Sequence, residues 1–333
     1  MAMKKFINDP ATLTKELLEG MALANSDVVE LVDGNLVVSK ALNNAKRVTI
    51  VTLGGSGHEP ALSGFVGDGM LDISVVGDVF AAPNPELVFK AIKLADKGQG
   101  VLFLVLNHAG DMLTGNKVMQ LVEKEGLKVR KVVTQEDISN APRSNSDDRR
   151  GLAGAIPLYH IAAAAAKEGK TLDEVAEIAQ KYADSMATIA VAARCATHPA
   201  TGASFGDLGE IDMEIGMGQH GEGGGGRQPL KTAKETIEIM ANALIKDIPL
   251  KSGDKAFVMI NGSGATTLME QFILYKDCVH YLEGLGIKVV ANMVGEILTV
   301  QEQAGFQLNI AKWDDEVLAR WNTPAYTIAF RRN

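Results

Sequence analysis

The feature that most constrains the fold of this chain is a regular alternation of short, aliphatic-rich runs with segments that have the apolar spacing of helices. Residues 47–53, 101–106 and 129–134 are such runs, and each is predicted to form a strand. Asn84 followed by Pro85 predicts a helix start between the first two, because proline is favoured at the first helical position. This alternation predicts an α/β architecture with a largely parallel sheet, in which ligands lie beyond the carboxyl ends of the strands.

The alternation returns in the second half of the chain. Residues 256–260 and 288–294 form two further strand-like runs, and residues 268–282 between them have helical spacing. No repeat of fixed period accompanies this pattern, so a solenoid is not predicted. A second α/β domain is expected.

Between the two halves the chain changes character. Residues 144–150 are polar without apolar period, and they are predicted to form a surface loop. Two helices are expected next, an alanine-rich one near residues 156–166 and a longer one over about 171–193 that begins with a capping box. We therefore expect two α/β domains, residues 1–184 and 185–333, each a mostly parallel or mixed sheet flanked by helices.

Composition excludes several classes of function. The chain has 333 residues, 46% of them hydrophobic, and a formal net charge of −8 without a Lys/Arg cluster, which argues against nucleic acid as a partner. Cys195 and Cys278 lack the CxxC spacing of zinc or redox sites, which favours a reducing compartment. Lys4-Lys5 is not followed by an apolar signal segment, and the strongest apolar run is too short to span a bilayer. We expect a cytoplasmic protein without membrane association.

Two of the predicted strands end in polar, glycine-rich loops. The loop at residues 54–60 offers backbone N–H groups and the imidazole of His58, and the loop at residues 106–111 offers the carboxylate of Asp111. Ordinary turn chemistry explains either loop taken alone, since glycine and Asx residues often end strands. In a parallel sheet, however, both loops can face one crevice. The backbone candidates for substrate contact are Gly55, Ser56 and Gly57.

A single histidine, His220, stands in a run of glycines over residues 216–226. Glycine removes the nearby side chains that would shield an imidazole, so His220 is predicted to be presented rather than packed. A presented imidazole can act as a base, a metal ligand or a nucleophile toward a carbonyl. The glycine run alone leaves these three roles open.

Short motif matches offer little support for other functions. Residues 216–221 match G-x-G-x-x-G, but the glycines that follow prevent the helix which a dinucleotide site requires. Residues 202–206 match G-x-S-x-G without a preceding buried strand, so a nucleophile elbow is not predicted. A Walker A sequence is absent, and Leu62 stands where H-E-x-x-H needs its second histidine. We therefore predict neither a nucleotide site nor a metal site on this chain.

Four segments carry a more specific signal than any of these patterns. Gly-Gly-Ser-Gly-His-Glu-Pro-Ala at residues 54–61, Gly-Phe-Val-Gly-Asp-Gly-Met-Leu at 64–71, Asn-His-Ala-Gly-Asp at 107–111 and Met-Glu-Ile-Gly-Met-Gly-Gln-His-Gly-Glu at 213–222 resemble the dihydroxyacetone kinase family. The likeness is to the K-type, substrate-binding subunit or domain of that family. It covers nearly the whole chain, with the motifs in family order.

The resemblance implies two α/β domains, a homodimer, and a short ketose held covalently as a hemiaminal on His220. It also implies that His58 assists at the bound substrate, that Asp111 takes the proton from the hydroxyl being phosphorylated, and that Gly55 makes a backbone contact. The chemistry agrees with these roles. A neutral imidazole nitrogen adds to a ketone or aldehyde but not to a polyol, so covalent capture would reject glycerol.

The resemblance further implies an alcohol-group phosphotransferase of the glycerone kinase type that works with a partner. A separate L-type subunit would hold ADP or ATP and Mg²⁺, with no cofactor on this chain. In many bacteria that have a kinase of this type, a phosphoprotein of the phosphotransferase system phosphorylates the bound ADP again. We see no second segment here that could carry a nucleotide.

Three positions depart from the family pattern. Leu106 stands where a lysine is frequent, Leu62 where a second histidine is frequent, and His108 where a tyrosine is frequent. These departures leave the ketose open between dihydroxyacetone and a four-carbon ketose such as erythrulose. A non-catalytic ketose sensor is a further alternative, although retention of Asp111 favours the kinase, because a sensor needs no base at the transferred hydroxyl.

Overall fold

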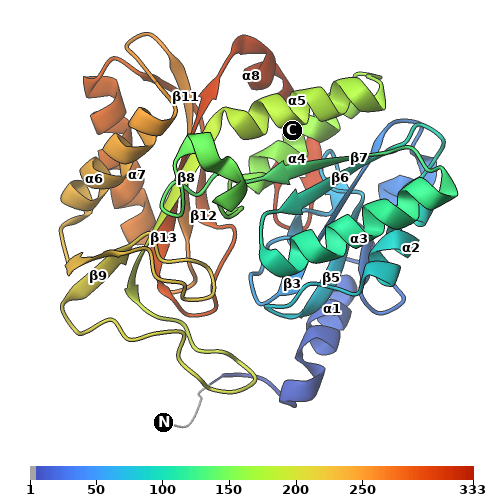
Figure 1. Ribbon diagram of the computed structural model, residues 1–333, viewed down its shortest axis with the longest axis horizontal. Helices are drawn as coiled ribbons and strands as arrows, with labels where there is room; N and C mark the ends of the chain where they lie inside the picture. Colours follow the sequence, from blue (N-terminus) through green and yellow to red (C-terminus); the bar gives the residue numbers. More distant parts are fainter. Residues whose placement is uncertain (1–4) are drawn as a thin grey trace. The chain divides into compact units, whose positions relative to one another are not determined.

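Two six-stranded sheets and one three-stranded sheet carry the β structure of residues 5–333, the part of the chain that the computed structural model describes (Figure 1). The chain divides into two units, and each six-stranded sheet lies within one of them. Within the described range, unit 1 comprises residues 5–6, 135–154 and 184–318, and unit 2 comprises residues 7–134, 155–183 and 319–333. Helices accompany both sheets, so the predicted α/β fold class is confirmed.

The larger sheet of unit 2 has the strand order β1-β2-β5-β3-β6-β7. Strands β5, β3, β6 and β7 are parallel, whereas β1 and β2 form an antiparallel hairpin at one edge. Since β3 and β6 are parallel neighbours, the glycine-rich loops that follow them lie at the same edge of this sheet. The strands are β1 (Val29–Val32), β2 (Leu36–Ser39), β3 (Thr49–Ser56), β5 (Ile73–Val79), β6 (Val101–Leu106) and β7 (Val129–Thr134).

The helices of unit 2 begin where the sequence supplies caps and pack through apolar stripes. The side chain of Asn84 accepts a hydrogen bond from the N–H of Glu86, with Pro85 at the first helical position, as predicted. Val88, Ile92 and Ala95 recur at helical spacing on this helix and are buried in the core beside the sheet. The helices are α1 (Leu13–Ala24), α2 (Pro85–Ala95), α3 (Ala109–Glu125), α4 (Ala155–Lys167) and α5 (Leu172–Asp184). The small sheet joins β4 (Gly67–Asp68), β14 (Ala325–Thr327) and β15 (Arg331–Arg332).

The sheet of unit 1 is mixed, with the strand order β10-β9-β8-β13-β11-β12. Only the pair β11 and β12 is parallel among its described neighbours. Helices α6 (Ala233–Asp247) and α7 (Leu268–Gly284) lie side by side and share one buried core with the sheet (Figure 1). The strands are β8 (Met186–Arg194), β9 (Asp212–Ile215), β10 (Gly226–Pro229), β11 (Lys255–Gly262), β12 (Lys288–Glu296) and β13 (Ala304–Trp313), and helix α8 (Asp315–Trp321) follows them.

The long helix predicted over about 171–193 is wrong in its second half. Helix α5 ends at Asp184, and strand β8 (Met186–Arg194) follows at once. The many alanines of this stretch favour a helix locally, but β8 is paired on both sides, with β9 and β13, and is buried over most of its length. Tertiary pairing therefore overrides helix propensity here.

The surface loop predicted over residues 144–150 is also corrected. A short 3₁₀ segment, Arg143–Asp148, occupies most of it, and the two arginines that follow are buried. Arg149 forms an ion pair with Asp247 on α6, with one nitrogen–oxygen distance of 3.0 Å. Two charged side chains that were predicted to lie in a surface loop thus anchor this segment, because Arg149 is paired with Asp247 and Arg150 with Asp137.

The two units are not continuous in sequence, whereas a single boundary after residue 184 was expected. Residues 135–154 belong to unit 1 because their backbone joins its sheet, as in the hydrogen bond from the N–H of Ile138 to the carbonyl of Thr188. Residues 319–333 belong to unit 2, where the carbonyl of Trp321 contacts the buried imidazole of His160 at 3.1 Å. Residues 135–154 and 319–333 are thus two exchanged segments, each of which belongs to the unit with which it is hydrogen-bonded.

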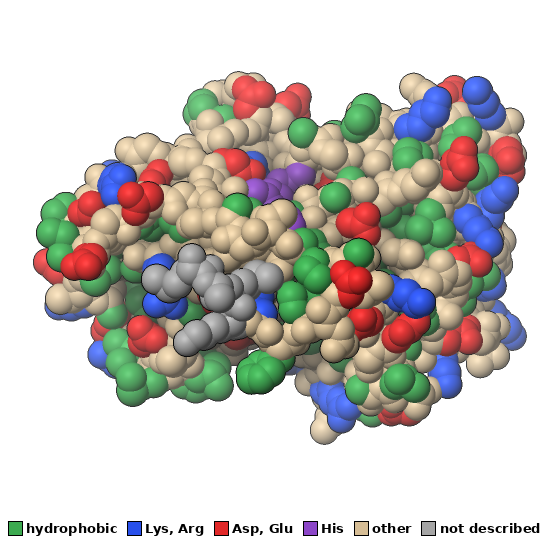
Figure 2. All heavy atoms as spheres, turned by 90° about the horizontal axis from the view of Figure 1, so that it is seen from below, with side chains coloured by type: hydrophobic (Ala, Val, Ile, Leu, Met, Phe, Trp, Pro, Cys, Tyr) green, Lys and Arg blue, Asp and Glu red, His purple; other side chains and the backbone are tan. Residues whose placement is uncertain are grey.

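Charged side chains of both signs are interspersed on the face drawn in Figure 2. Lys and Arg side chains stand among Asp and Glu there rather than gathering in one basic patch, in keeping with the net charge of −8. Within residues 5–333, none of the helices combines the length and the apolar character that crossing a bilayer demands.

Glu136 is a buried carboxyl group in the exchanged segment of unit 1. Its Oε1 accepts a hydrogen bond from the N–H of Leu152 at 2.8 Å, whereas Oε2 has no hydrogen-bond partner among the described residues. Burial raises the pKa of Glu136 to about 8. The native protein therefore holds a proton on this group well above the pH at which an exposed glutamate loses it.

We expect Glu136→Gln to remove part of the pH dependence of stability. In the unfolded chain this carboxyl ionises near its ordinary pKa of 4.5, whereas in the native protein it keeps its proton up to about pH 8. The free energy of unfolding of the wild type should therefore fall as pH rises through this window, and glutamine has no proton to lose. Urea unfolding at pH 5 and pH 8 measures the change, with the exposed Glu30→Gln as control. Parallel pH profiles for wild type and Glu136→Gln would contradict the expectation.

Candidate active site

The loop that carries His220 connects the antiparallel strands β9 and β10 of unit 1. The backbone geometry of this loop requires glycine. Gly221 has φ +79°, and a Cβ on it would lie 2.3 Å from the carbonyl oxygen of Phe205. The N–H of Gly218 donates to the carbonyl of Glu222 at 2.8 Å, which closes the loop around the histidine. Only glycine fits this tight path without strain.

Gly221→Ala is expected to destabilise unit 1 more than Gly225→Ala. Gly225 also has a positive φ, +73°, but a Cβ on it would meet no atom within 4 Å. The Gly225 variant should lose about 1–2 kcal/mol for the left-handed backbone alone, and the Gly221 variant should lose more because it adds a clash with Phe205. Denaturant unfolding of the two variants side by side measures the difference. Equal losses would show that the contact with Phe205 imposes no constraint.

The imidazole of His220 is half-buried, with 29% of its side chain exposed. The backbone N–H of His220 donates to Oε2 of Glu222 at 2.9 Å, and its Nδ1 lies 3.3 Å from Oε1 of the same carboxylate. Burial raises the pKa of Glu222, but the hydrogen bonds from His220 outweigh this and hold the pKa well below its ordinary value. The histidine is thus held from one side by an ionised carboxylate.

Arg150 lies behind this pair and is itself firmly held. Its Nε donates to Oδ2 of Asp137 at 2.8 Å, and its Nη2 donates to the carbonyl of Gly216 at 2.9 Å. Its Nη1 lies 3.8 Å from Oε2 of Glu222. A Cβ on Gly218 would lie 2.1 Å from Nη1 of Arg150 and 2.2 Å from Oε2 of Glu222. Glycine at 218 therefore leaves the room in which the two charges approach each other.

In unit 2, the end of β3 and the loop after it carry the other predicted residues of the glycine-rich motif, because the strand continues through Ser56 and the loop begins later than predicted. The hydroxyl of Ser56 is buried and bonds to that of Thr14 at 2.8 Å, so it serves the packing of α1. Gly55 lies against the 78–81 backbone, where a Cβ would be 2.7 Å from the nitrogen of Ala81. Gly57 has φ +100° and donates its N–H to Oε1 of Glu59 at 2.9 Å. The loop is held by its own backbone and by the segment after β5.

His58 is nearly buried and packs against Phe80. The ring centroids lie 4.9 Å apart at an interplanar angle of 58°. Phe80 has φ +58°, an uncommon conformation for an aromatic residue, and its N–H donates to the carbonyl of Ser56 at 2.9 Å. This ring therefore forms a wall beside the His58 imidazole.

Asp111 lies in the first turn of α3, directly beyond the end of β6. A carboxylate is favoured there because the unpaired N–H groups of a helix start carry partial positive charge. Gly110 lies against Ala82, and the hydroxyl of Thr114 donates to the carbonyl of Pro83 at 3.1 Å. The start of α3 and the loop after β3 thus both pack on residues 80–83, so the two glycine-rich loops are brought together within unit 2.

The structure groups the predicted residues by unit. Gly55, Ser56, Gly57, His58 and Asp111 belong to unit 2, and His220 belongs to unit 1. The sequence reasoning missed the residues that hold these side chains, namely Glu222, Arg150 and Phe80. Glu222 lies in the segment at residues 213–222 that resembles the family, so its role could have been predicted. Nothing local in the sequence distinguishes Arg150 or Phe80.

The structure also shows where the three residues that depart from the family pattern lie. Leu106 at the end of β6 and Leu62 are buried, and a Cβ on Gly54 would lie 2.9 Å from Cδ1 of Leu62. Leu62 therefore packs against the backbone near the end of β3. His108 caps the start of α3 through its backbone, without a side-chain capping bond.

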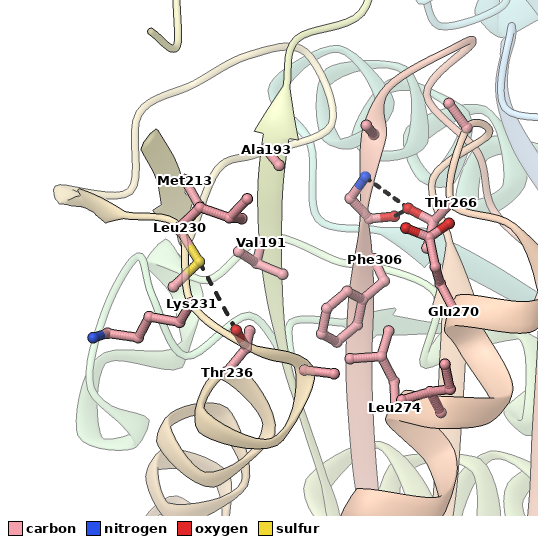
Figure 3. A pocket seen from close by; sticks show the side chains of 15 residues that line it. Val191, Ala193, Met213, Leu230, Lys231, Thr236, Thr266, Glu270, Leu274 and Phe306 are labelled. Atoms are coloured by element: carbon pink, nitrogen blue, oxygen red, sulfur yellow. Dashed lines mark hydrogen bonds between the residues drawn. The ribbon is translucent and has the colours of Figure 1, made fainter. Parts of the chain in front are cut away.

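A separate apolar cavity of about 280 Å³ lies in unit 1, between the sheet and the first turns of α6 and α7 (Figure 3). Val191, Leu274 and Phe306 are among its lining side chains, and none of the predicted site residues lines it. Its hydroxyl groups bond within the protein, as Thr266 does with the backbone of Gly305 at 2.6 Å. The cavity offers apolar contact and few polar groups, unlike the loops described above.

The chain matches one known domain family over nearly its whole length. The model of the Dak1 domain matches residues 19–329. The chain belongs to the Dak1 domain family. The match spans all of the glycine-rich motifs, so the resemblance found in the sequence is confirmed.

Individual relatives agree with this membership. The chain is 35% identical over 332 residues to the dihydroxyacetone-binding subunit DhaK of a PTS-dependent dihydroxyacetone kinase from Listeria innocua, covering 98% of this chain and 100% of that one. It is 33% identical over 334 residues to an L-erythrulose kinase from Pectobacterium atrosepticum, covering 99% of this chain but 56% of that one. The solved structure of the dihydroxyacetone kinase operon co-activator DhaQ superposes with a TM-score of 0.89 at 30% identity, covering 96% of this chain and 98% of that one.

Proposed function

We propose that this chain is the substrate-binding subunit of a dihydroxyacetone-type kinase and holds a short ketose covalently on His220 as a hemiaminal. The observation that carries the proposal is the half-buried imidazole of His220 in a glycine loop, held by the carboxylate of Glu222. An imidazole nitrogen that adds to a carbonyl forms a bond that a polyol cannot form. Selection of ketose over glycerol then follows from carbonyl reactivity.

The roles of the residues in unit 2 follow the family pattern. His58 assists at the bound substrate, and Gly55 supplies a backbone contact. Asp111 accepts the proton of the hydroxyl that receives the phosphoryl group. A positioned carboxylate suits this role, because phosphoryl transfer depends mainly on positioning and on stabilising charge. The location of Asp111 in the first turn of α3, beside the loop that carries His58, is consistent with it.

The phosphoryl donor is proposed to come from a partner. An L-type subunit would hold ADP or ATP with Mg²⁺, and the relative in Listeria innocua belongs to a PTS-dependent kinase. This chain would contribute the ketose site and form a homodimer. The reaction then takes place between a captured ketose on one subunit and a nucleotide on another.

Dihydroxyacetone is the proposed ketose, with erythrulose as the alternative. The relative named for dihydroxyacetone is matched over its whole length, whereas the erythrulose kinase is matched over 56% of its length. The buried Leu62 and Leu106 replace polar residues frequent in the family. A leucine side chain offers no polar group to the hydroxyl of a fourth carbon, and this supports the smaller ketose.

A non-catalytic ketose sensor is the second candidate. The fold is shared with the co-activator DhaQ at a TM-score of 0.89, so this architecture also occurs in a regulator. Asp111 favours the kinase, since capture of a ketose alone requires no proton acceptor at the transferred hydroxyl.

Reconstitution with an L-type subunit loaded with ADP, together with its phosphoryl donor, tests the proposal. Turnover of dihydroxyacetone above that of erythrulose, with glycerol inert, is the expected result. Capture of ketose without turnover by any tested L-type subunit would favour the sensor. Turnover of glycerol at the rate of a ketone would contradict covalent capture as the basis of selection.

A further inference from the structure

Two carboxylates of unit 1 hold the glycine loop from different sides. Glu214 accepts hydrogen bonds from the backbone N–H groups of Gly224 and Gly225 at 2.8 and 3.3 Å. Glu222 accepts from the backbone N–H of His220 and also contacts the imidazole at Nδ1. Both carboxylates support the loop, but Glu222 is the one that reaches the ring.

A neutral imidazole has one N–H and one basic nitrogen, and the partner of one nitrogen determines the state of the other. An ionised carboxylate only accepts hydrogen bonds, so the 3.3 Å contact from Oε1 of Glu222 requires the proton on Nδ1. The lone pair of the neutral ring is then on Nε2. Glu222 therefore selects the tautomer of His220.

The position of Glu222 is fixed in turn by Arg150. The guanidinium is anchored on the buried carboxylate of Asp137 and on the carbonyl of Gly216, and its Nη1 faces Oε2 of Glu222 at 3.8 Å. A positive charge at this distance favours the ionised form of Glu222. Because Arg150 also bonds the backbone of the loop, it holds the carboxylate and the histidine segment in one frame.

We infer that Glu222 is a positioning residue for ketose capture: it fixes His220 as the Nδ1-protonated tautomer and thereby makes Nε2 the nucleophile. This inference rests on the proposed covalent function of His220. Arg150 acts through Glu222 by keeping its carboxylate charged and in place.

The inferred role gives a balanced capture step. The lone pair of Nε2 forms a bond to the carbonyl carbon of the ketose, and the π bond of that carbonyl breaks as its electrons move to oxygen. The oxygen takes up a proton from water, and the ring, positive after addition, gives up its Nδ1 proton through the carboxylate of Glu222 to the hydroxide that remains, which regenerates the water. The product is a neutral hemiaminal with no net change in protons. A carboxylate at Nδ1 stabilises the positive charge that the ring carries during addition.

Long-range ¹H–¹⁵N spectra of the full chain without ketose test the tautomer directly. The wild type should show a protonated Nδ1 and an unprotonated Nε2 at His220 in its neutral form. Glu222→Ala should lose this preference, and Glu222→Gln should weaken it, because the carboxylate accepts from both the backbone N–H and Nδ1 of His220 whereas a glutamine amide has only one oxygen that can accept. Glu214→Ala is the matched control for a loosened loop, because it removes a carboxylate of β9 that supports the loop without contacting the ring, and it should keep the wild-type tautomer.

Capture of ¹³C-labelled dihydroxyacetone by the same four proteins completes the test. Glu222→Ala should reduce capture by about 10- to 100-fold, the usual cost of removing a carboxylate that orients a functional histidine. Glu222→Gln should fall between Glu222→Ala and the wild type, and Glu214→Ala, which loosens the loop but leaves the tautomer unchanged, should lose less capture than Glu222→Ala. An Nε2-protonated wild type, or a Glu222→Ala variant with an unchanged tautomer, would overturn the role of Glu222. If the wild type has the expected tautomer but captures no ketose, the proposed function fails while the tautomer assignment stands.

Discussion

Replacing His220 with alanine should abolish covalent capture and lower ketose turnover in the reconstituted complex by more than about 10³-fold, the order of loss when a covalent nucleophile is removed. Alanine leaves no group in the loop that can add to a carbonyl. The glycine path around residue 220 does not depend on the imidazole, because its closing hydrogen bonds are made by the backbone. The variant should therefore fold, and the loss should lie in chemistry.

His280→Ala is the control for this variant, since His280 is an exposed residue of α7 in the same unit. It should leave capture and turnover unchanged. Dihydroxyacetone turnover by His220→Ala at the wild-type rate would rule out the covalent model. If His220→Ala still captured the ketose but no longer turned it over, His220 would act in phosphoryl transfer rather than in capture.

Asp111→Asn should separate capture from phosphoryl transfer. Asparagine is close to isosteric and keeps the helix start intact, but it cannot accept the hydroxyl proton. We expect turnover to fall by about 10²- to 10⁴-fold, the range for loss of a general base, while the fraction of ketose held by the protein changes little. Parallel assays of capture and of product formation measure the two quantities on one preparation.

Asp173→Asn makes the same chemical change in the first turn of α5, also in unit 2. It should affect neither quantity. Loss of capture in Asp111→Asn would assign this carboxylate to ketose binding rather than to proton transfer. Full turnover would show that Asp111 is not the proton acceptor and would leave the kinase without an identified base.

The fold was largely predictable because local signals and tertiary structure agree over most of the chain. The apolar run at residues 101–106 became strand β6 with the predicted bounds, and Asn84-Pro85 began α2. Disagreement arose at β8, where alanine-rich sequence adopts a strand because it is paired on both sides. Long-range pairing of this kind leaves no local pattern.

The candidate site was predictable in its motifs but not in its supports. His58, Asp111 and His220 stand out because glycine and strand ends surround them. Arg150 gave no such signal: its role depends on Asp137 and Glu222, which meet it only through the fold of unit 1. A polar segment without pattern can therefore be buried and structural when its charges find distant partners.

The central claim is that His220 forms a covalent bond to a ketose, and ¹³C spectroscopy tests it most directly. Dihydroxyacetone labelled at its carbonyl carbon would be added to the wild type and to His220→Ala. We predict that the wild type converts part of the ketone signal into that of a tetrahedral carbon bonded to nitrogen, with ¹³C–¹⁵N coupling to the His220 ring, and that the variant does not. A bound ketose that keeps its ketone signal in the wild type, or an equal tetrahedral signal in the variant, would contradict the account.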